Sequence, residues 1–360
     1  MKSNYKALGQ YIRLVDERNA SLLDLPLMGL SVSKVFFPTI ANLVGTDMTT
    51  YKVVYKNQFT YIADTSRRGD KIAISLNEKF DKILVSQAYT PFEVSNANQL
   101  DPEYLMMWFR RPEFDRYARF MSHGSAREIF GWEEMCNTLL PIPSIAKQKE
   151  IVKEYNVIQN RIALNQQLVQ KLEETAQTIY KQCFAEGLTK DDPITIGDLF
   201  TPKKGRNITR ENAIDGVYPV IAGGLEPSCY HNSCNTKSPV VTISASGANA
   251  GYVRLYQNNV WAADCSYIDK DVFKDVYFAY VSLKINQSLL MSMQEGTGQP
   301  HIYPEHIVTI PIYGFTDEKL NEFNNQCRAI FSRVGIAEKE NQKLGQMKDL
   351  LLSKLATMEN

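Results

Sequence analysis

Two long stretches of this chain place mostly apolar residues at alternating steps of four and three, and the second stretch repeats the first. The first seam is Ile151, Tyr155, Ile158, Ile162, Asn165, Val169, Leu172, Ala176, Ile179 and Cys183. The second seam is Phe323, Cys327, Ile330, Val334, Ala337, Asn341, Leu344, Lys348, Leu351 and Leu355. Each seam has ten positions, and the two begin 172 residues apart. Because a 3.5-residue period keeps one face of a helix against a partner, the pattern predicts two coiled-coil helices, each roughly 50 Å long at about 1.5 Å per residue.

Each seam contains one asparagine near its middle. Asn165 is the fifth position of the first seam, and Asn341 is the sixth position of the second. An antiparallel pairing sets them side by side, and a partner amide removes much of the cost of burying one amide alone, on the order of 1–3 kcal/mol. We therefore expect an intramolecular antiparallel coiled coil whose register Asn165 and Asn341 fix. Ordinary amphipathic packing, or a parallel homodimer with mismatched asparagines, are the alternatives.

The segments that precede the two helices also repeat. Leu8-Gly9-Gln10 is echoed by Ile196-Gly197-Asp198. Asp101 and Gly124 enclose an apolar helical stretch at 104–120, as Asp275 and Gly298 do at 278–293. Short strand-like runs occur at 53–55, 59–62, 71–74 and 83–85, and again at 217–221, 240–243 and 252–256. The fold class is therefore α/β (α+β), with an α/β module at 1–145, a long helix at 146–187, a second module at 188–315 and a second helix at 316–360.

Composition narrows the setting of the protein. No run of 18 apolar residues and no charged-then-apolar leader is present, so we expect an unexported, cytoplasmic protein. The six cysteines are scattered, and two lie on the seams, so a disulfide framework is not expected. Cys229, His231 and Cys234 lie close in sequence, but the nearest further thiol is the isolated Cys265. Structural zinc needs four ligands, usually as two close pairs, so no metal site is predicted.

Charge patterning is local, because 40 basic and 40 acidic residues cancel overall. Lys203, Lys204, Arg206 and Arg210 place four cations within eight residues without an acid. In the first module, Arg67, Arg68 and Lys71 form a loop-like cluster. A second set, Arg110, Arg111, Arg116 and Arg119, is interspersed with Glu113 and Asp115, so it fits a solvated surface as well as a binding face. A neutral chain that binds nucleic acid implies that a basic partner supplies part of the phosphate binding.

Motifs for catalysis are missing from the sequence. It has no phosphate-binding loop, no His-Glu-x-x-His, no Gly-x-Ser-x-Gly and no Asn/Asp-Pro-Pro-aromatic tetrapeptide. His301 and His306 flank Tyr303-Pro304, but no acid or nucleophile is matched to them, which favours binding or packing over catalysis. We therefore expect a chain that performs no chemistry itself.

Several segments, in this order and duplicated, resemble the specificity subunit of type I restriction-modification systems. In the second half they are Val241-Thr242-Ile243-Ser244, Gly247, Gly251-Tyr252-Val253, Trp261, Asp264, Gly296-Thr297-Gly298-Gln299-Pro300-His301-Ile302-Tyr303 and Ile310-Pro311-Ile312. In the first half they are Ser122-His123-Gly124-Ser125-Ala126-Arg127-Glu128, Leu140-Pro141-Ile142-Pro143-Ser144 and Gln148-Lys149-Glu150. The resemblance covers essentially the whole chain. The first module lacks the Gly-x-Gln-Pro-His form, so the two modules are expected to read different sequences.

The resemblance implies a non-catalytic subunit with two target recognition domains that read the two halves of a bipartite double-stranded DNA target. The paired helices would act as a ruler that sets the gap between the halves. Two methyltransferase (M) subunits would dock on the helices and domains, and restriction (R) subunits can join them. The chain itself would need no cofactor, because S-adenosylmethionine, and ATP with Mg for restriction, would be bound by the partner subunits.

Loop positions near the shared motifs are the candidates for DNA contact, because Arg and Lys suit guanine edges or phosphates and Asn and Gln suit adenine. In the first module these are Arg67, Arg68, Lys71, Ser125 and Arg127; in the second they are Lys203, Lys204, Arg206, Ser246, Asn249, Gln299 and His301. Other readings stay open: a coiled-coil scaffold that binds proteins, a recognition subunit whose partner fuses methyltransferase and nuclease in one chain, and, more remotely, an independent hydrolase.

Overall fold

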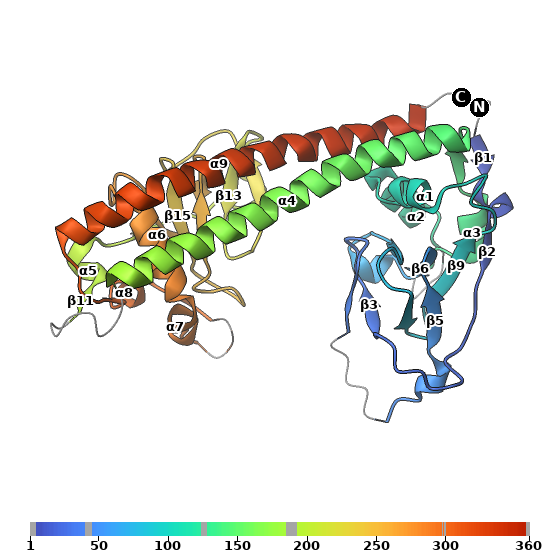
Figure 1. The fold of residues 1–360 in the computed structure, drawn as a ribbon, viewed down its shortest axis with the longest axis horizontal. Coiled ribbons are helices and arrows are strands. Elements are labelled where there is room, and N and C mark those ends of the chain that lie inside the picture. The colour runs from blue at the N-terminus through green and yellow to red at the C-terminus, as the bar shows by residue number, and fades with distance from the viewer. Residues whose placement is uncertain are drawn as a thin grey trace. The chain divides into compact units, whose positions relative to one another are not determined.

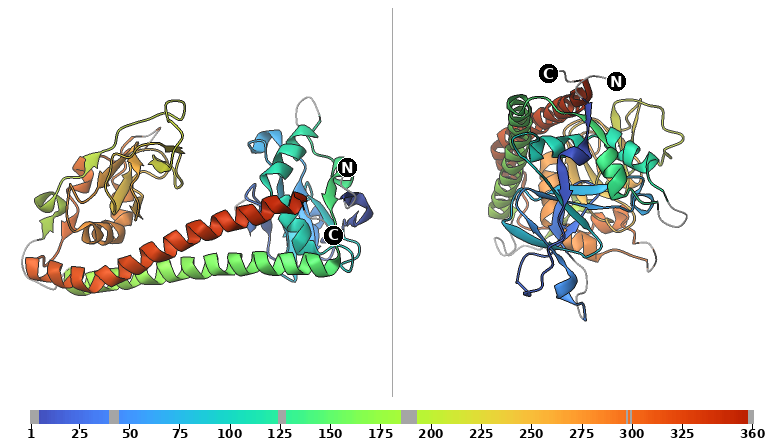
Figure 2. Two further views of the ribbon diagram at one scale, coloured as in Figure 1. Left: turned by 90° about the horizontal axis from the view of Figure 1, so that it is seen from above. Right: turned by 90° about the vertical axis from the view of Figure 1, so that its right-hand side faces the viewer.

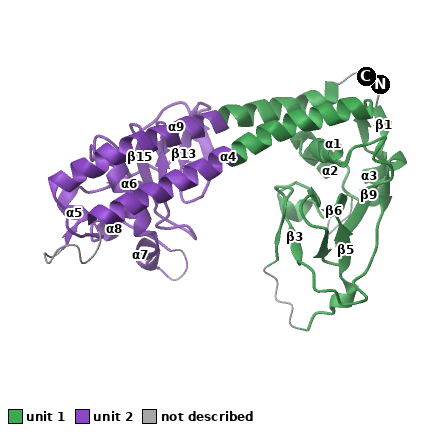
Figure 3. Ribbon diagram, in the orientation of Figure 1, with its two compact units in different colours: residues 1–163, 342–360 green, residues 164–341 purple. Residues whose placement is uncertain are grey.

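The computed structural model describes residues 5–39, 45–123, 128–184, 193–296, 298 and 300–357. The chain forms two compact units, residues 1–163 with 342–360 and residues 164–341 (Figure 3). Each unit combines a sheet-containing module with a stretch of both long helices. Within the described ranges, no helix is long and apolar enough to cross a membrane.

The two predicted long helices are α4 (Ile145–Phe184) and α9 (Asp317–Lys354). In each unit they lie side by side (Figures 1 and 2) and run in opposite directions. Ile151 and Tyr155 at the start of α4 pack with Leu352 near the end of α9 in the first unit, whereas Tyr180 and Phe323 share the core of the second. Not one of the twenty seam positions is exposed. The predicted antiparallel coiled coil is thereby confirmed.

Both helices begin where a hydroxyl side chain caps the first turn. The Ser144 hydroxyl oxygen accepts the backbone N–H of Lys147 at 3.4 Å, and the Thr316 hydroxyl oxygen accepts that of Lys319 at 3.2 Å. Such caps satisfy one of the donors that a helix N-terminus leaves without a partner. Pro143 immediately precedes the first cap, which keeps α4 from extending backwards.

The two seam asparagines meet inside the second unit. The Asn165 Nδ2 donates to the Asn341 Oδ1 at 3.0 Å, and Asn165 is 2% exposed. The amides therefore satisfy one another in the position that the antiparallel register predicts.

Replacing Asn165 by leucine should destabilise the second unit by about 1–3 kcal/mol, because Asn341 loses its partner while half-buried. The Asn165→Leu/Asn341→Leu double variant should recover most of that loss, since no amide is then left unpaired. Thermal unfolding of both single variants and the double variant measures the coupling, and strictly additive effects would contradict the pairing.

The sheets of the two modules have the same strand order. In the first unit the antiparallel order is β2 (Ile12–Leu14), β9 (Thr90–Val94), β6 (Gln58–Ile62) and β7 (Ala73–Leu76). In the second it is β12 (Lys203–Lys204), β18 (Cys265–Ile268), β15 (Val240–Ser244) and β16 (Val253–Tyr256). The duplication predicted from the sequence thus extends to topology, with β6 and β15 as the equivalent central strands.

Smaller sheets surround these central ones. Each module is closed by one short pair, β1 (Tyr5–Ala7) with β10 (Leu139–Pro141) and β11 (Ile194–Thr195) with β19 (Pro311–Ile312). The first unit adds β3 (Met28–Leu30) with β4 (Phe36–Pro38) and β5 (Lys52–Tyr55) with β8 (Lys82–Val85). The second adds β14 (Cys229–His231), β13 (Tyr218–Ile221) and β17 (Trp261–Ala262).

The expected helical stretches at 104–120 and 278–293 are each broken into two helices. They are α1 (Pro102–Phe109) with α2 (Pro112–Phe120), and α6 (Val276–Ile285) with α7 (Gln287–Ser292). Pro112 explains the first break, because a proline ring clashes with a preceding helical turn and Arg111 is accordingly extended. The remaining short helices are η1 (Leu8–Gln10), η2 (Met48–Thr50), η3 (Ser66–Arg68), α3 (Trp132–Asn137), α5 (Ile196–Leu199), α8 (Pro304–Ile307) and η4 (Leu355–Thr357).

Each module packs on the stretch of the long helices that belongs to its own unit. In the first unit, Phe59 and Phe92 stack at 4.9 Å between ring centroids, in the same core as Tyr155. In the second, Tyr180 of α4 contacts the ring of Phe278 at 5.6 Å. Buried aromatic contacts of this kind fix each module on its helices.

Candidate nucleic-acid interface

The central strands of the two modules end in equivalent surroundings. After β6, Asp64 forms an isolated bridge with Ile129, which also bridges to His123. After β15, Ser246 bridges to His301, which also bridges to Glu295. We call the described residues of 63–72 and 122–130 the first loop face, and those of 245–252 and 295–303 the second loop face. The sequence-predicted DNA contacts of the loop after β6 and of the loop after β15 occupy equivalent places in the two modules.

The first loop face presents its cations on a tight turn. Arg67 and Arg68 lie on η3, and Lys71 follows a turn in which Gly69 and Asp70 both have left-handed φ values, 67° and 59°. Arg67 and Lys71 are exposed, whereas Arg68 is half-buried with its Nε lacking a hydrogen-bond partner. Ser125 and Arg127, the other candidates of this module, lie outside the described residues. Two of the predicted cations are thus available to a phosphate backbone.

Helix α2 contacts both segments of the first loop face. The Arg119 guanidinium donates to the carboxylates of Asp70 at 2.7 Å and Glu128 at 2.5 Å, and these hydrogen bonds raise the pKa of Arg119. The Asp115 carboxylate accepts the backbone N–H of Ile72 at 3.2 Å. The Thr65 hydroxyl donates to the Ser122 hydroxyl oxygen at 2.8 Å. The two segments of this face are therefore joined to one another and to α2.

A buried ion pair supports the same helix. The Lys34 ammonium donates to the Asp115 carboxylate at 2.8 Å and to the Phe109 carbonyl at 2.6 Å, and Lys34 is 5% exposed. Burial lowers the pKa of Lys34, and the Asp115 carboxylate offsets part of that shift. A charge in this setting is tolerated only because its partners are in place.

The second loop face is held mainly by uncharged groups. The Ser246 hydroxyl donates to the Asp264 carboxylate, and the Asn249 side-chain amide donates to the Gly223 carbonyl at 3.2 Å. The backbone N–H of Gly247 donates to the Pro300 carbonyl at 3.0 Å. Ser246 and Asn249, both candidates for DNA contact, therefore use part of their hydrogen-bonding capacity within the protein.

An aromatic pair lies at the edge of the second loop face. The rings of His301 and Tyr303 are nearly parallel, at 8° and 5.8 Å between centroids, and the Lys204 ammonium lies 5.9 Å from the Tyr303 centroid. Lys203, Lys204 and Arg206 are all exposed, with the lysines on edge strand β12. Gln299, the remaining candidate, lies outside the described residues. The structure thus places Lys204 of the basic strand beside Tyr303, whose ring lies parallel to that of His301.

The helical arginines of the first module all have acidic partners. Arg110 pairs with Glu78, Arg111 and Arg116 with Glu113, and Arg119 with Asp70 and Glu128. Arg111 in addition lies 4.3 Å above the Trp108 ring. The sequence did not decide whether these arginines form a solvated surface or a binding face. The structure shows that they form ion pairs within the module.

Sequence reasoning missed several residues that belong to the two faces or contact them. Tyr303 was noticed only as a neighbour of histidines, although an exposed aromatic beside a lysine is a stacking candidate. Gln287, the first residue of α7, donates to the Gly251 carbonyl at 2.6 Å and accepts the Val253 N–H at 2.9 Å. No local signal marks Arg119 or Gln287, because their partners come from distant segments.

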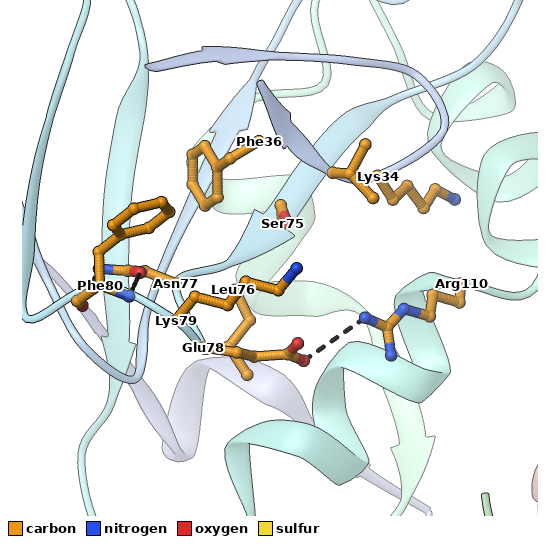
Figure 4. A pocket seen from close by; sticks show the side chains of 10 residues that line it. Lys34, Phe36, Ser75, Leu76, Asn77, Glu78, Lys79, Phe80 and Arg110 are labelled. Atoms are coloured by element: carbon orange, nitrogen blue, oxygen red, sulfur yellow. Dashed lines mark hydrogen bonds and ion pairs between the residues drawn. The ribbon is translucent and has the colours of Figure 1, made fainter. Parts of the chain in front are cut away.

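The first unit has a cleft of about 250 Å³ between the β3–β4 turn and the turn after β7. Figure 4 shows the side chains that line it. Phe36 and Phe80 form apolar parts of its lining. Two of its cations are already paired, Arg110 with Glu78 at 3.4 Å and Lys34 with Asp115. The charges of Arg110 and Lys34 are therefore neutralised by acidic residues of the same module.

Among the described residues, no group of three or more His, Cys, Asp or Glu side chains is placed to hold a metal ion. The ring of His231 instead packs edge-on against Trp261 at 4.9 Å, and its Nδ1 accepts the backbone N–H of Ile214 at 3.0 Å. This histidine therefore has a packing role in the second module.

Comparison with known proteins identifies the second module. Residues 192–313 match the type I restriction modification DNA specificity domain. A putative type I specificity subunit of Mycoplasma pneumoniae is 32% identical over 122 residues, which are 33% of this chain and 32% of that protein. The second module is therefore similar to the DNA specificity domain of type I restriction-modification systems. The family resemblance found in the sequence is thereby confirmed, although the matched stretch spans only about a third of the relative's length.

The fold agrees over almost the whole chain. The crystal structure of the S subunit of a type I restriction-modification system from M. genitalium is similar at a TM-score of 0.57 and 15% identity. The match covers 99% of this chain and 96% of that one. This chain therefore shares the fold of that S subunit.

Proposed function

We propose that this chain is the DNA-sequence specificity subunit of a type I restriction-modification system, acting in the cytoplasm. The observation that carries the proposal is the pair of loop faces, which occupy equivalent places on two modules of the same topology but carry different side chains. The first face exposes Arg67 and Lys71. The second face instead has the stacked rings of His301 and Tyr303, beside the basic strand β12. One frame with two sets of contacts suits a target made of two different half-sites.

In this proposal, partner subunits supply the cofactors and the catalytic activities. Two methyltransferase subunits would bring S-adenosylmethionine, and restriction subunits would bring ATP and Mg. Exposed apolar side chains on the long helices support docking of other subunits there: Val157, Met347 and Leu350 in the first unit, and Leu164 and Ile336 in the second. The paired helices would set the length of the gap between the half-sites.

The basic strand β12 offers a direct test of DNA contact. Replacing Lys203 and Lys204 together by glutamine should weaken DNA binding by the complex with its methyltransferase about tenfold and lower the slope of log Kd against log salt by about two, because two phosphate contacts are lost. Fluorescence anisotropy with a labelled target duplex at several salt concentrations measures both quantities.

The matched control is Lys237→Gln/Lys270→Gln. These lysines flank β15 and β18 at their other ends, away from the second loop face, and their replacement removes the same charge from the same unit. If both double variants weaken DNA binding equally, the loss reflects the general charge of the unit. That result would contradict a DNA contact at β12.

A further inference from the structure

We infer that the second helix of the equivalent helix pair in each module, α2 of the pair α1–α2 and α7 of the pair α6–α7, is the positioning element of that module's DNA-reading loop. In the first module Arg119 performs this role, and in the second Gln287 does. The inference rests on the proposed function and deepens it, since it names residues that set recognition without touching DNA.

In the first module the positioning contacts are ionic. Arg119, at the end of α2, joins Asp70 in the loop after β6 to Glu128 in the opposing segment. Among the described residues, Asp70 is one of four non-glycine residues with a left-handed φ, a conformation that is sparsely populated outside glycine. The ion pair holds this turn and therefore fixes the direction in which Arg67 and Lys71 leave it.

In the second module an amide makes the equivalent contacts. Gln287, at the start of α7, donates to the Gly251 carbonyl and accepts the Val253 N–H, so it spans the junction between the loop and β16. The loop is close to α7 there, because a Cβ added at Gly251 would lie 3.3 Å from the Leu290 backbone. The loop that carries Ser246 and Asn249 is thus anchored at its end.

The two helices share one equivalent contact, made by Asp115 of α2 in the first module and by Gln287 of α7 in the second, through groups of different chemistry. Asp115 accepts the N–H of Ile72 just before β7, as Gln287 accepts that of Val253 at the start of β16. These strands neighbour the central strands β6 and β15 in the same sheet order. Both modules therefore hold the same loop from the same helix, although one uses charges and the other an amide.

The consequence is that each anchor should affect one half-site only. Releasing a loop leaves its DNA-facing side chains present but free to adopt other directions, so discrimination between right and wrong bases falls more than overall binding. Because the other module keeps its own anchor, its half-site should be read as before.

The test uses the full chain in complex with its methyltransferase, with Arg119→Met and Gln287→Leu as the variants. Methylation rates are measured on the target duplex and on duplexes carrying single base changes in either half-site. We expect Arg119→Met to reduce discrimination about tenfold in one half-site, and Gln287→Leu to do so in the other, since a good base contact supplies about that much. Arg119→Lys, which keeps a cation, should restore part of the loss.

The matched controls are Arg116→Met, an exposed arginine of the same helix, and Ser288→Ala, an exposed neighbour of Gln287; both should leave discrimination unchanged. Three results would overturn the positioning role. Discrimination could fall in the same half-site for both variants, it could fall equally in both half-sites for either variant, or it could stay unchanged. Wild-type complex that shows no split target at all would instead overturn the proposed function, and the inference with it.

Discussion

Replacement of Asp115 by alanine is expected to destabilise the first unit by about 3–5 kcal/mol, because the Lys34 ammonium then stays buried without its carboxylate. The Ile72 N–H loses its acceptor in the same variant. For a unit of this size the unfolding midpoint should fall by roughly 10 °C. Differential scanning calorimetry measures the shift, and a transition assigned to the second unit should stay in place.

Two further variants make the expectation specific to the ion pair. Arg116→Ala, on the exposed side of the same helix, should change stability by no more than about 0.5 kcal/mol. Lys34→Met should lower the free energy of unfolding less than Asp115→Ala does, because the Asp115 carboxylate still accepts the hydrogen bond from the Ile72 N–H. An Asp115→Ala variant as stable as Arg116→Ala would show that the pair is not buried in solution.

Replacement of Gly205 by alanine is expected to displace strand β12, the basic strand that lies beside Tyr303 of the second loop face. A Cβ at this position would lie 2.2 Å from the Ala263 carbonyl oxygen and 2.8 Å from those of Ala262 and Cys265. Backbone atoms on the neighbouring strand have no room to move, so the cost is about 1–3 kcal/mol. Lys203 and Lys204 would leave their places, and DNA affinity should fall at least as far as in the double glutamine variant, about tenfold.

Binding titrations and thermal unfolding together check this expectation. Gly345→Ala is the matched control, because nothing lies within 4 Å of its added Cβ and it lies inside helix α9. Alanine there should leave the fold intact and stabilise the helix by about 0.5–1 kcal/mol. Unchanged DNA binding by Gly205→Ala would show that β12 is not part of the interface.

The sequence predicted the long helices and the duplication because both depend on regular spacing. A 3.5-residue period is visible without any knowledge of the partner, and the asparagine in each seam was enough to choose the antiparallel direction. The breaks inside the shorter helical stretches were misjudged. Pro112 lies within an apolar run that otherwise reads as one helix, and Asn286 carries no comparable signal.

The details of the loop faces were beyond sequence reasoning for a physical reason. Arg119 is 49 residues from Asp70 in the chain, so nothing local distinguishes this ion pair from an arginine facing solvent. The same holds for Gln287, whose partners lie 34 and 36 residues away. Which of the exposed side chains contact bases stays a prediction, since recognition loops differ freely on a common frame.

Mapping of methylated adenines in host DNA, after co-expression of this chain with its partner methyltransferase, tests the central claim most directly. The account predicts a new motif in two specified halves separated by a gap of constant length, and its disappearance when either chain is omitted. Unchanged methylation despite a stable complex of the two proteins would contradict the claim that this chain reads DNA.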